Sequence, residues 1–227
     1  MLRITDARSG DAIDVRPGLT RVHAHVTGAD TSALRVLLVA DVLARALELG
    51  GTPVVTVAAP SAELRARADD LGIRPADPEG PAVGQALHVV GAQGTAPGGV
   101  RIEVAPAIGP ADTTAQPSTL RLALLTRPRR HPADLGTDAL AEARDTLVRW
   151  RKAVAAWATR PSRPVPERVR QDLRAAWEDD LDVPAVLEVL RRVESAGDMP
   201  DGARFETYAY ADRLLGLDLA REIGARP

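Results

Sequence analysis

The residues Arg21-Val22-His23-Ala24-His25-Val26-Thr27-Gly28 decide the fold that we expect for this chain. Apolar and polar side chains alternate along the segment as far as Val26, which is the period of a β-strand. Gly28 favours a turn directly after that strand. The segment therefore predicts a strand with one buried face that ends in a glycine turn, with Thr27 and Gly28 at its carboxyl end.

A long helix and a second strand are expected next. Residues Ser32 to Leu49 are apolar nearly all round, so the helix they form should be buried, and Gly50-Gly51 should end it. Pro53 to Ala59 contains a β-branched run that is typical of a central parallel strand. Strand, crossover helix and strand predict a βαβ unit, which is part of a Rossmann-like nucleotide-binding fold.

The remaining N-terminal elements are expected to be short. Ser61 should cap a helix that Gly72 ends. The other expected elements are a first strand at Leu2 to Asp6, a turn-rich segment at Ser9–Gly18, and strands at Ala86–Val90 and Val100–Val104 joined by a hairpin turn at Gly91–Gly99. The loop from Pro106 to Pro117 is the predicted domain boundary.

After Thr119 the chain is expected to be helical. One helix-bundle stripe, with spacings of three and four, consists of Leu140, Ala143, Leu147, Trp150, Val154 and Trp157. Asp182 before Val183-Pro184 predicts a capped helix start. Trp177 lies on a further stripe, where core packing is expected for tryptophan. We therefore predict an α/β Rossmann-like domain over residues 1–115 and an all-α helical bundle domain over residues 116–227.

Composition excludes several classes of function. The 227 residues carry a net charge of −2, so the chain as a whole does not attract polyanions. There is no cysteine, which excludes disulfides, thiolate nucleophiles and zinc sites built on cysteine. Charged residues interrupt the most apolar helix, and no signal peptide is visible, so we expect a cytoplasmic protein without a membrane partner.

Three parts of the chain carry a family resemblance. The first joins Leu2-Arg3-Ile4-Thr5-Asp6, Val26-Thr27-Gly28 and Ala40-Asp41-Val42-Leu43-Ala44-Arg45; the second runs from Leu120 to Leu140; the third joins Trp150-Arg151, Asp179 to Ala185 and Leu214-Leu215-Gly216-Leu217. Together they resemble the class I cysteinyl-tRNA synthetases and their relative, the mycothiol-pathway cysteine ligase. The resemblance implies adenylation of cysteine by ATP, with zinc binding the substrate thiolate.

The chain departs from the family at every point where that chemistry is performed. The resemblance implies a histidine-glycine-histidine signature where this chain has Asp30-Thr31-Ser32-Ala33, and a metal-binding cysteine where it has Thr27. The family's lysine-serine signature has no counterpart, because Lys152 is the only lysine. We therefore assign no catalytic residue and no metal ligand, and zinc is not an expected cofactor. ATP or AMP remain candidate ligands.

Two candidate sites follow from the strand that opens the fold. Thr27, Gly28 and Asp30 lie where a strand meets a helix, the place at which Rossmann-like folds bind nucleotides. His23 and His25 share one face of the strand and could bind a metal if Asp30 joined them, but two polar residues on the accessible side of a strand are the favoured interpretation. Asp41 is expected to cap or pair at the helix surface.

A third candidate site is the basic loop. Arg127, Arg129 and Arg130, followed by His131, could contact RNA phosphates, but no aromatic residues interleave with them for base stacking. A solvated loop is the favoured interpretation, and tRNA is not the favoured partner.

The hypothesis on function is a non-catalytic relative of the cysteinyl-tRNA synthetase and cysteine ligase group. It would act by binding a protein partner or a small nucleotide or amino-acid ligand. Two alternatives stay open: an aminoacyl-adenylate-type ligase of altered chemistry that uses ATP, and a tRNA- or RNA-binding module. Arginines such as Arg35 and Arg101 around an open nucleotide-shaped cavity would contradict the non-catalytic interpretation.

Overall fold

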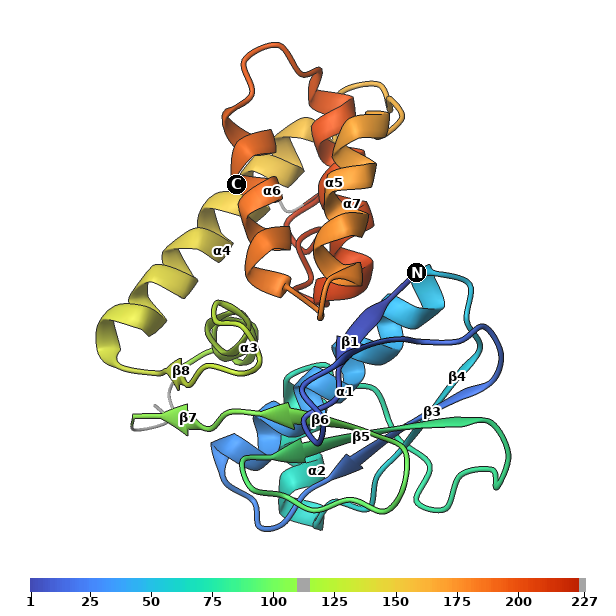
Figure 1. Ribbon diagram of the computed structural model, residues 1–227. Helices are drawn as coiled ribbons and strands as arrows, with labels where there is room; N and C mark the ends of the chain where they lie inside the picture. Colours follow the sequence, from blue (N-terminus) through green and yellow to red (C-terminus); the bar gives the residue numbers. More distant parts are fainter. Residues whose placement is uncertain (110–114, 225–227) are drawn as a thin grey trace.

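A parallel sheet forms the centre of the N-terminal half in the computed structural model, which describes residues 1–109 and 115–224 (Figure 1). The sheet has the order β4-β3-β5-β6. Its strands are β3 (Thr20–His25), β4 (Val54–Val57), β5 (Gln85–Gly91) and β6 (Val100–Val104). All three pairings are parallel, with His23 opposite both Val57 and His88. The Rossmann-like α/β prediction is confirmed.

One face of this sheet is covered by α1 (Thr31–Leu49). Val22 and Ala24 of β3 turn their side chains to this inner face and are buried, as are Leu87 and Val89 beside them on β5. The helix is buried over most of its length because its sequence is apolar nearly all round. The helix α2 (Ala62–Asp70) packs beside α1, with Ser61 as its N-cap, as expected.

The outer face of the sheet carries Arg21, His23, His25, His88 and Arg101. Loops cover it in the described part of the chain. Arg21 donates to the carbonyls of Pro81 and Gly84, and Arg8 to those of Ala96 and Gly99, so arginines hold the loops 78–84 and 92–99 against the strands. Parallel sheets are ordinarily covered by helices on both faces, so this half has one conventional layer and one layer of loops.

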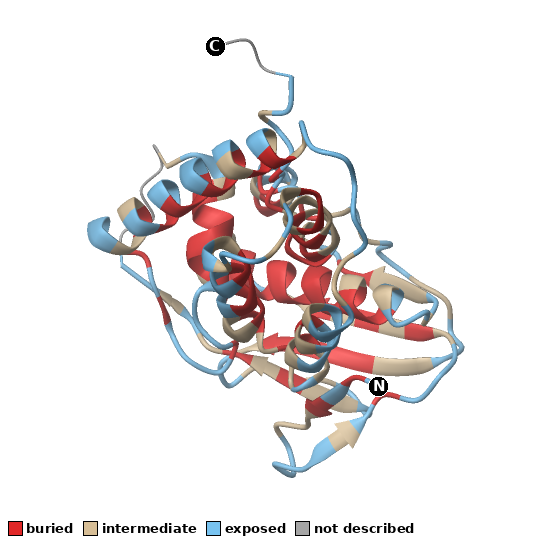
Figure 2. Cartoon of the chain, turned by 90° about the horizontal axis from the view of Figure 1, so that it is seen from above, coloured by how far each residue is buried: buried red, intermediate tan, exposed pale blue. Residues whose placement is uncertain are grey.

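The C-terminal half is a group of packed helices, seen above the sheet in Figure 1. They are α3 (Pro117–Leu125), α4 (Thr137–Trp157), α5 (Glu167–Glu178), α6 (Val183–Ser195) and α7 (Asp201–Leu215). The predicted stripe of α4 is buried, and Trp150 and Trp157 both pack edge-on against Tyr208 of α7. Figure 2 shows buried residues, coloured red, both in the sheet and in these helices. Asp182 caps α6 as expected, through a bond to the Ala185 amide.

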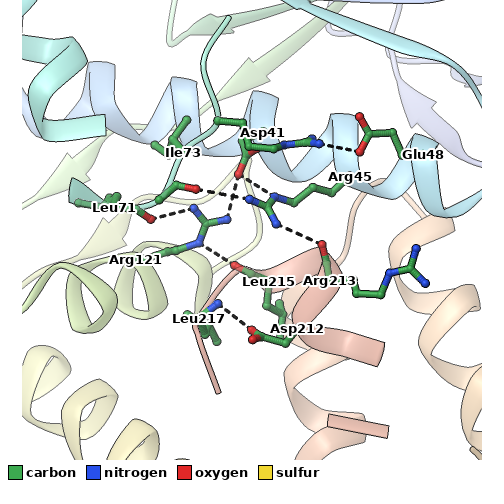
Figure 3. Close-up of polar contacts among 12 residues, drawn as sticks. Asp41, Arg45, Glu48, Leu71, Ile73, Arg121, Asp212, Arg213, Leu215 and Leu217 are labelled. Carbon is green, nitrogen blue, oxygen red and sulfur yellow. Dashed lines mark hydrogen bonds and ion pairs between the residues drawn. The ribbon is translucent and has the colours of Figure 1, made fainter. Parts of the chain in front are cut away.

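A buried charge cluster joins the two halves (Figure 3). Asp41 of α1 accepts hydrogen bonds from Arg45, Arg74 and Arg121 at 2.9, 2.8 and 3.0 Å. Its side chain is only 2% exposed. The neighbouring guanidinium groups, Arg121 first, lower the pKa of Asp41 against the opposing effect of its burial. The predicted pairing of Asp41 is confirmed. The prediction that Asp41 lies at the helix surface was wrong, because α3 and α7 pack over it.

Other differences concern the strands. The hairpin at Gly91–Gly99 was wrong: β5 and β6 are parallel, so this loop runs back along the sheet. The turn-rich Ser9–Gly18 contains β2 (Ala12–Asp14), which pairs antiparallel with β1 (Arg3–Thr5) outside the main sheet. Short β7 (Ala107–Ile108) and β8 (Ala133–Asp134) pair with each other. The predicted boundary loop includes 110–114, which lie outside the described residues.

Candidate functional site

An open cleft of about 760 Å³ lies at the carboxyl ends of β3 and β5. The chain leaves β3 towards β4 on one side, while β5 lies on the other, so this is the topological switch point where open α/β sheets bind ligands. Its lining comes from the end of β3, the start of α1 and the loop after β5; the polar members are His25, Thr27, Asp30, Ser32, Gln93 and Thr95. Two of the three predicted nucleotide-site residues, Thr27 and Asp30, therefore line the cleft.

Gly28, the third predicted residue, shapes the turn instead of lining the cleft. Its φ is +77°, in the left-handed region that glycine adopts without strain. The turn is held from α2, because Arg67 donates to the Ala29 carbonyl and, at 3.0 Å, to the Thr31 hydroxyl. These bonds fix where α1 begins and so fix one wall of the cleft.

Asp30 occupies the N-terminus of α1. Its carboxylate accepts a hydrogen bond of 2.7 Å from the Ala33 amide, so it is the N-cap of the helix. The Ser32 hydroxyl accepts a hydrogen bond from the Ala107 amide at 3.2 Å. In Rossmann-like folds a ligand phosphate binds at this helix end. Here a carboxylate takes that place and would repel a phosphate.

The described lining residues include no lysine or arginine. Adenylation builds up negative charge on a departing pyrophosphate, which fixed cations or hydrogen-bond donors must stabilise. Arg101 of β6 lies outside the cleft and donates to the Ala7 carbonyl at 2.9 Å. The arrangement of arginines around the cavity that would have contradicted the non-catalytic interpretation is therefore not present among the described residues.

Arg35 is close in sequence to the cleft but is fully buried beneath it. Its Nη1 donates at 2.7 Å to the carbonyls of both Ala105 and His131, and its Nη2 donates to those of Arg127 and Pro128. Burial lowers the pKa of Arg35 to about 10, so the group is cationic at neutral pH. Arg35 therefore fixes two loops and is not directed at a ligand.

The two candidate histidines belong to a cluster of three. His25 Nε2 lies 2.9 Å from Nδ1 of His88, and the His23 ring centroid is 4.9 Å from that of His88. Burial lowers the pKa of all three side chains, that of His88 to about 4. The sequence placed His88 in a strand, but the parallel register that sets it opposite His23 has no signal in a single sequence.

The residues present do not fit the zinc that the family resemblance implies. Thr27 stands where the family has a metal-binding cysteine, and the chain contains no cysteine elsewhere. Among the described residues, no group of three histidine, cysteine or carboxylate side chains is arranged to hold a metal ion. The described residues therefore do not form a zinc site of the kind that the resemblance implies.

The basic loop does not bring its arginines together. Arg129 is 5% exposed and forms an ion pair of 2.5 Å with Asp180, while Arg130 approaches the same carboxylate at 3.4 Å. Arg127 and His131 are exposed. Phosphate binding needs several cations that converge on one surface, and here a carboxylate and burial oppose that for Arg129.

Comparison with known proteins identifies relatives. The L-cysteine:1D-myo-inositol 2-amino-2-deoxy-alpha-D-glucopyranoside ligase of Streptomyces griseus is 40% identical over 107 residues, which are 45% of this chain and 25% of that protein. Over this segment the chain is similar to the cysteine ligases. Ligases of the same name from Streptosporangium roseum and Streptomyces scabiei are 38% and 36% identical over 46% and 45% of the chain. The family resemblance expected from the sequence is confirmed.

The relationship to the cysteine ligases has a limited extent. The matched segment spans about a quarter of the length of these relatives. No family model matches the chain. The reaction in the relatives' name therefore describes those proteins. No helix in the described ranges is both long enough and apolar enough to cross a membrane.

Proposed function

We propose that this chain is a non-catalytic relative of the cysteine ligases that binds a small molecule in the cleft between β3 and β5. The observation that carries the proposal is the lining: the place where a Rossmann-like fold binds phosphate holds the Asp30 carboxylate and, among the described residues, no cation. A ligase would need positive charge there for ATP to lose pyrophosphate.

The same lining indicates the kind of ligand. An apolar floor, formed by residues such as Ala24, Ala33 and Val36, lies beside hydroxyl and amide groups of Thr27, Thr95 and Gln93. This combination suits a flat or compact molecule with several hydrogen-bonding groups. Among adenine compounds, we therefore expect adenosine or AMP to bind better than ATP, because each added phosphate would be repelled by the Asp30 carboxylate. A protein partner for the helical half remains a prediction from the sequence.

Calorimetric titration with adenosine, AMP, ATP and cysteine tests the proposal. We expect one of the ligands without a triphosphate to bind, and Thr27→Trp to abolish that binding by filling the cleft. Thr137→Trp, at an exposed threonine at the start of α4, is the matched control and should leave binding unchanged. If none of the four compounds binds, ligand binding in this cleft is contradicted for the classes proposed.

ATP–pyrophosphate exchange separates the proposal from the ligase alternative. We expect no exchange above the background without protein, with cysteine or with any other standard amino acid. Exchange that depends on one amino acid and is lost in Thr27→Trp would show an active adenylating site and would overturn the non-catalytic assignment.

A further inference from the structure

The loop-covered face of the sheet contains three imidazoles in mutual contact. His23 and His25 project from β3 and His88 from β5, with ring centroids 4.9 to 6.2 Å apart. His88 is 3% exposed because the loop 92–99 lies over it. A Cβ built on Gly99 would lie 3.3 Å from His88 Nε2, so the loop fits closely on that ring.

A line of contacts runs from the cleft to this loop. His25 lines the cleft, and its Nε2 faces Nδ1 of His88 at 2.9 Å. The other side of the His88 ring lies against the loop at Gly99. The contact between the two imidazoles has room for one N–H, so one ring donates and the other accepts. This bond therefore depends on the pair carrying no second proton.

The groups around the cluster oppose added positive charge. Arg21 of β3, Arg8 of the loop 6–11 and Arg101 of β6, the register partner of His88, are cationic. The carboxylates on this side are Asp6 and Glu103 of β6, and Asp6 already accepts from the backbone amides of Arg8 and Arg101. Val55 and Val57 of β4 are apolar, and Glu79 in the loop 78–84 is exposed. No charged residue occurs in the loop 92–99.

We propose that the three histidines form a pH-sensitive latch that holds the loop 92–99 in place and, through it, the wall of the ligand cleft. The latch controls the shape of the cleft described above. Only its effect on ligand binding rests on the proposed function. The first part of the loop, Gln93 to Thr95, lines the cleft, while the second part covers His88. Release of the loop therefore removes one wall of the cleft.

Protons drive the release because the open loop binds them better than the closed one. One proton can be shared between His25 Nε2 and His88 Nδ1 after a change of tautomer, but two would set N–H against N–H across 2.9 Å. In the closed state the pKa of His88 is about 4, and in an opened loop it returns to the ordinary value of 6.5. Between these values the open state takes up a proton, so acid favours opening, by roughly 70-fold for His88 alone between pH 7.5 and 4.5.

Amide hydrogen exchange without ligand tests the latch directly. The amide of Gly94, which donates to the Gly91 carbonyl at 2.9 Å, reports on the closed loop. We expect its protection factor, corrected for the intrinsic pH dependence of exchange, to fall by roughly 70-fold from pH 7.5 to 4.5. His88→Gln keeps a donor and an acceptor but cannot be protonated, so its protection should stay constant within about threefold.

His131→Gln is the matched control, because His131 is the fourth histidine and is exposed away from the cluster. This variant should retain the full pH response. An equal response in wild type and His88→Gln, or none in wild type, would overturn the latch. If His88→Gln does not fold, an NMR titration of the wild-type imidazoles decides: a His88 that titrates near 6.5 without any change at Gly94 contradicts the latch.

Calorimetry with adenosine as the probe then separates the latch from the proposed function. We expect adenosine affinity to fall at least tenfold from pH 7.5 to 5.0 in wild type and to change less than threefold in His88→Gln. If adenosine does not bind at pH 7.5, the proposed function is contradicted. The hydrogen-exchange result then still tests the latch by itself. Binding that is independent of pH, together with a loop that opens, would contradict the coupling of loop and cleft.

Discussion

Arg121 of α3 and Asp41 of α1 lie eighty positions apart and form an ion pair of 3.0 Å, with side chains 0% and 2% exposed. Arg121 also donates from Nε to the Leu215 carbonyl at 2.6 Å and from Nη1 to the Leu71 carbonyl at 3.1 Å. One side chain therefore connects α1, the end of α2 and the end of α7. This contact lies where the helical half packs against α1 (Figure 3).

Replacement of Arg121 should be strongly destabilising. Arg121→Met removes the charge that pairs with Asp41 inside the protein and leaves two buried carbonyls without a donor, so we expect a loss of about 3–5 kcal/mol in the free energy of unfolding. Urea denaturation followed by circular dichroism measures it. Arg174→Met removes the exposed Arg174 from its pair with Glu178 and should cost below ~1 kcal/mol. Similar losses in the two variants would contradict the role of Arg121.

Gly216 is expected to be intolerant of alanine for two reasons. Its φ is +60°, and an added Cβ would lie 2.7 Å from Nη2 of Arg121. The left-handed backbone alone costs an L-residue roughly 1–2 kcal/mol, and the displacement of Arg121 adds to it. Gly10→Ala is the control, because Gly10 has a φ of +80° with open space around it. Thermal unfolding should show a clearly larger decrease in Tm for Gly216→Ala than for Gly10→Ala.

Arg35→Met should destabilise the base of the cleft. The carbonyls of Ala105, His131 and Pro128 lose their donor, and each unsatisfied buried group costs about 1–3 kcal/mol, partly recovered by burying an apolar side chain. We expect a loss of about 3 kcal/mol by urea denaturation, and faster amide exchange around residues 105–108. Arg127→Met, at an exposed arginine, should change stability by less than ~0.5 kcal/mol. A stable Arg35→Met would show that the carbonyl contacts contribute little.

Two substitutions of Asp30 separate the effect of its charge on ligand binding from its effect on helix capping. Asparagine caps helices as well as aspartate, so Asp30→Asn should leave Tm nearly unchanged, whereas Asp30→Ala should cost about 1 kcal/mol. Removing the negative charge at the helix N-terminus should raise the affinity for AMP relative to adenosine by about fivefold. Calorimetry of both ligands checks this. An unchanged ratio would mean that the phosphate does not lie near Asp30.

Stability should fall towards acid in two stages. The folded state lowers the pKa of His88 to about 4, so its neutral form contributes stability above pH 6.5 that is lost as the pH falls towards 4. The arginines around Asp41 lower the pKa of that carboxyl, so its contribution is present above about 3.8 and is lost further into acid. We expect Tm to decrease from pH 7.5 downwards. A maximum of Tm at pH 5 would contradict this order.

The sequence was sufficient for the elements whose signal is local. The alternation in residues 21–26, the apolar run of α1 and the caps at Ser61 and Asp182 each act within a few residues, and all appear as expected. The strand at residues 100–104 was also predicted, but its direction was not. A Gly-rich connection of this length serves either a hairpin or a return along the sheet, and tertiary packing selects between them.

The site was predictable only in part for the same reason. Thr27 and Asp30 follow from the position of a strand end before a helix, which a single sequence reveals. Gln93 and Thr95 join them through the path of the loop after β5, and the parallel register of β5 places His88 beside His25. Arg35 and Asp41 were visible as charges within an apolar helix, but their partners come from residues far along the chain.

The loops 78–84 and 92–99 replace a layer of helices over one face of the sheet, and this reverses the usual guidance for modifying the protein. Surface loops normally accept inserted tags or fusion partners, whereas an insertion in either of these loops would uncover β-strand side chains to water. Fluorophores and affinity tags therefore belong on the exposed side of α4, where Lys152 offers the only lysine side chain for coupling.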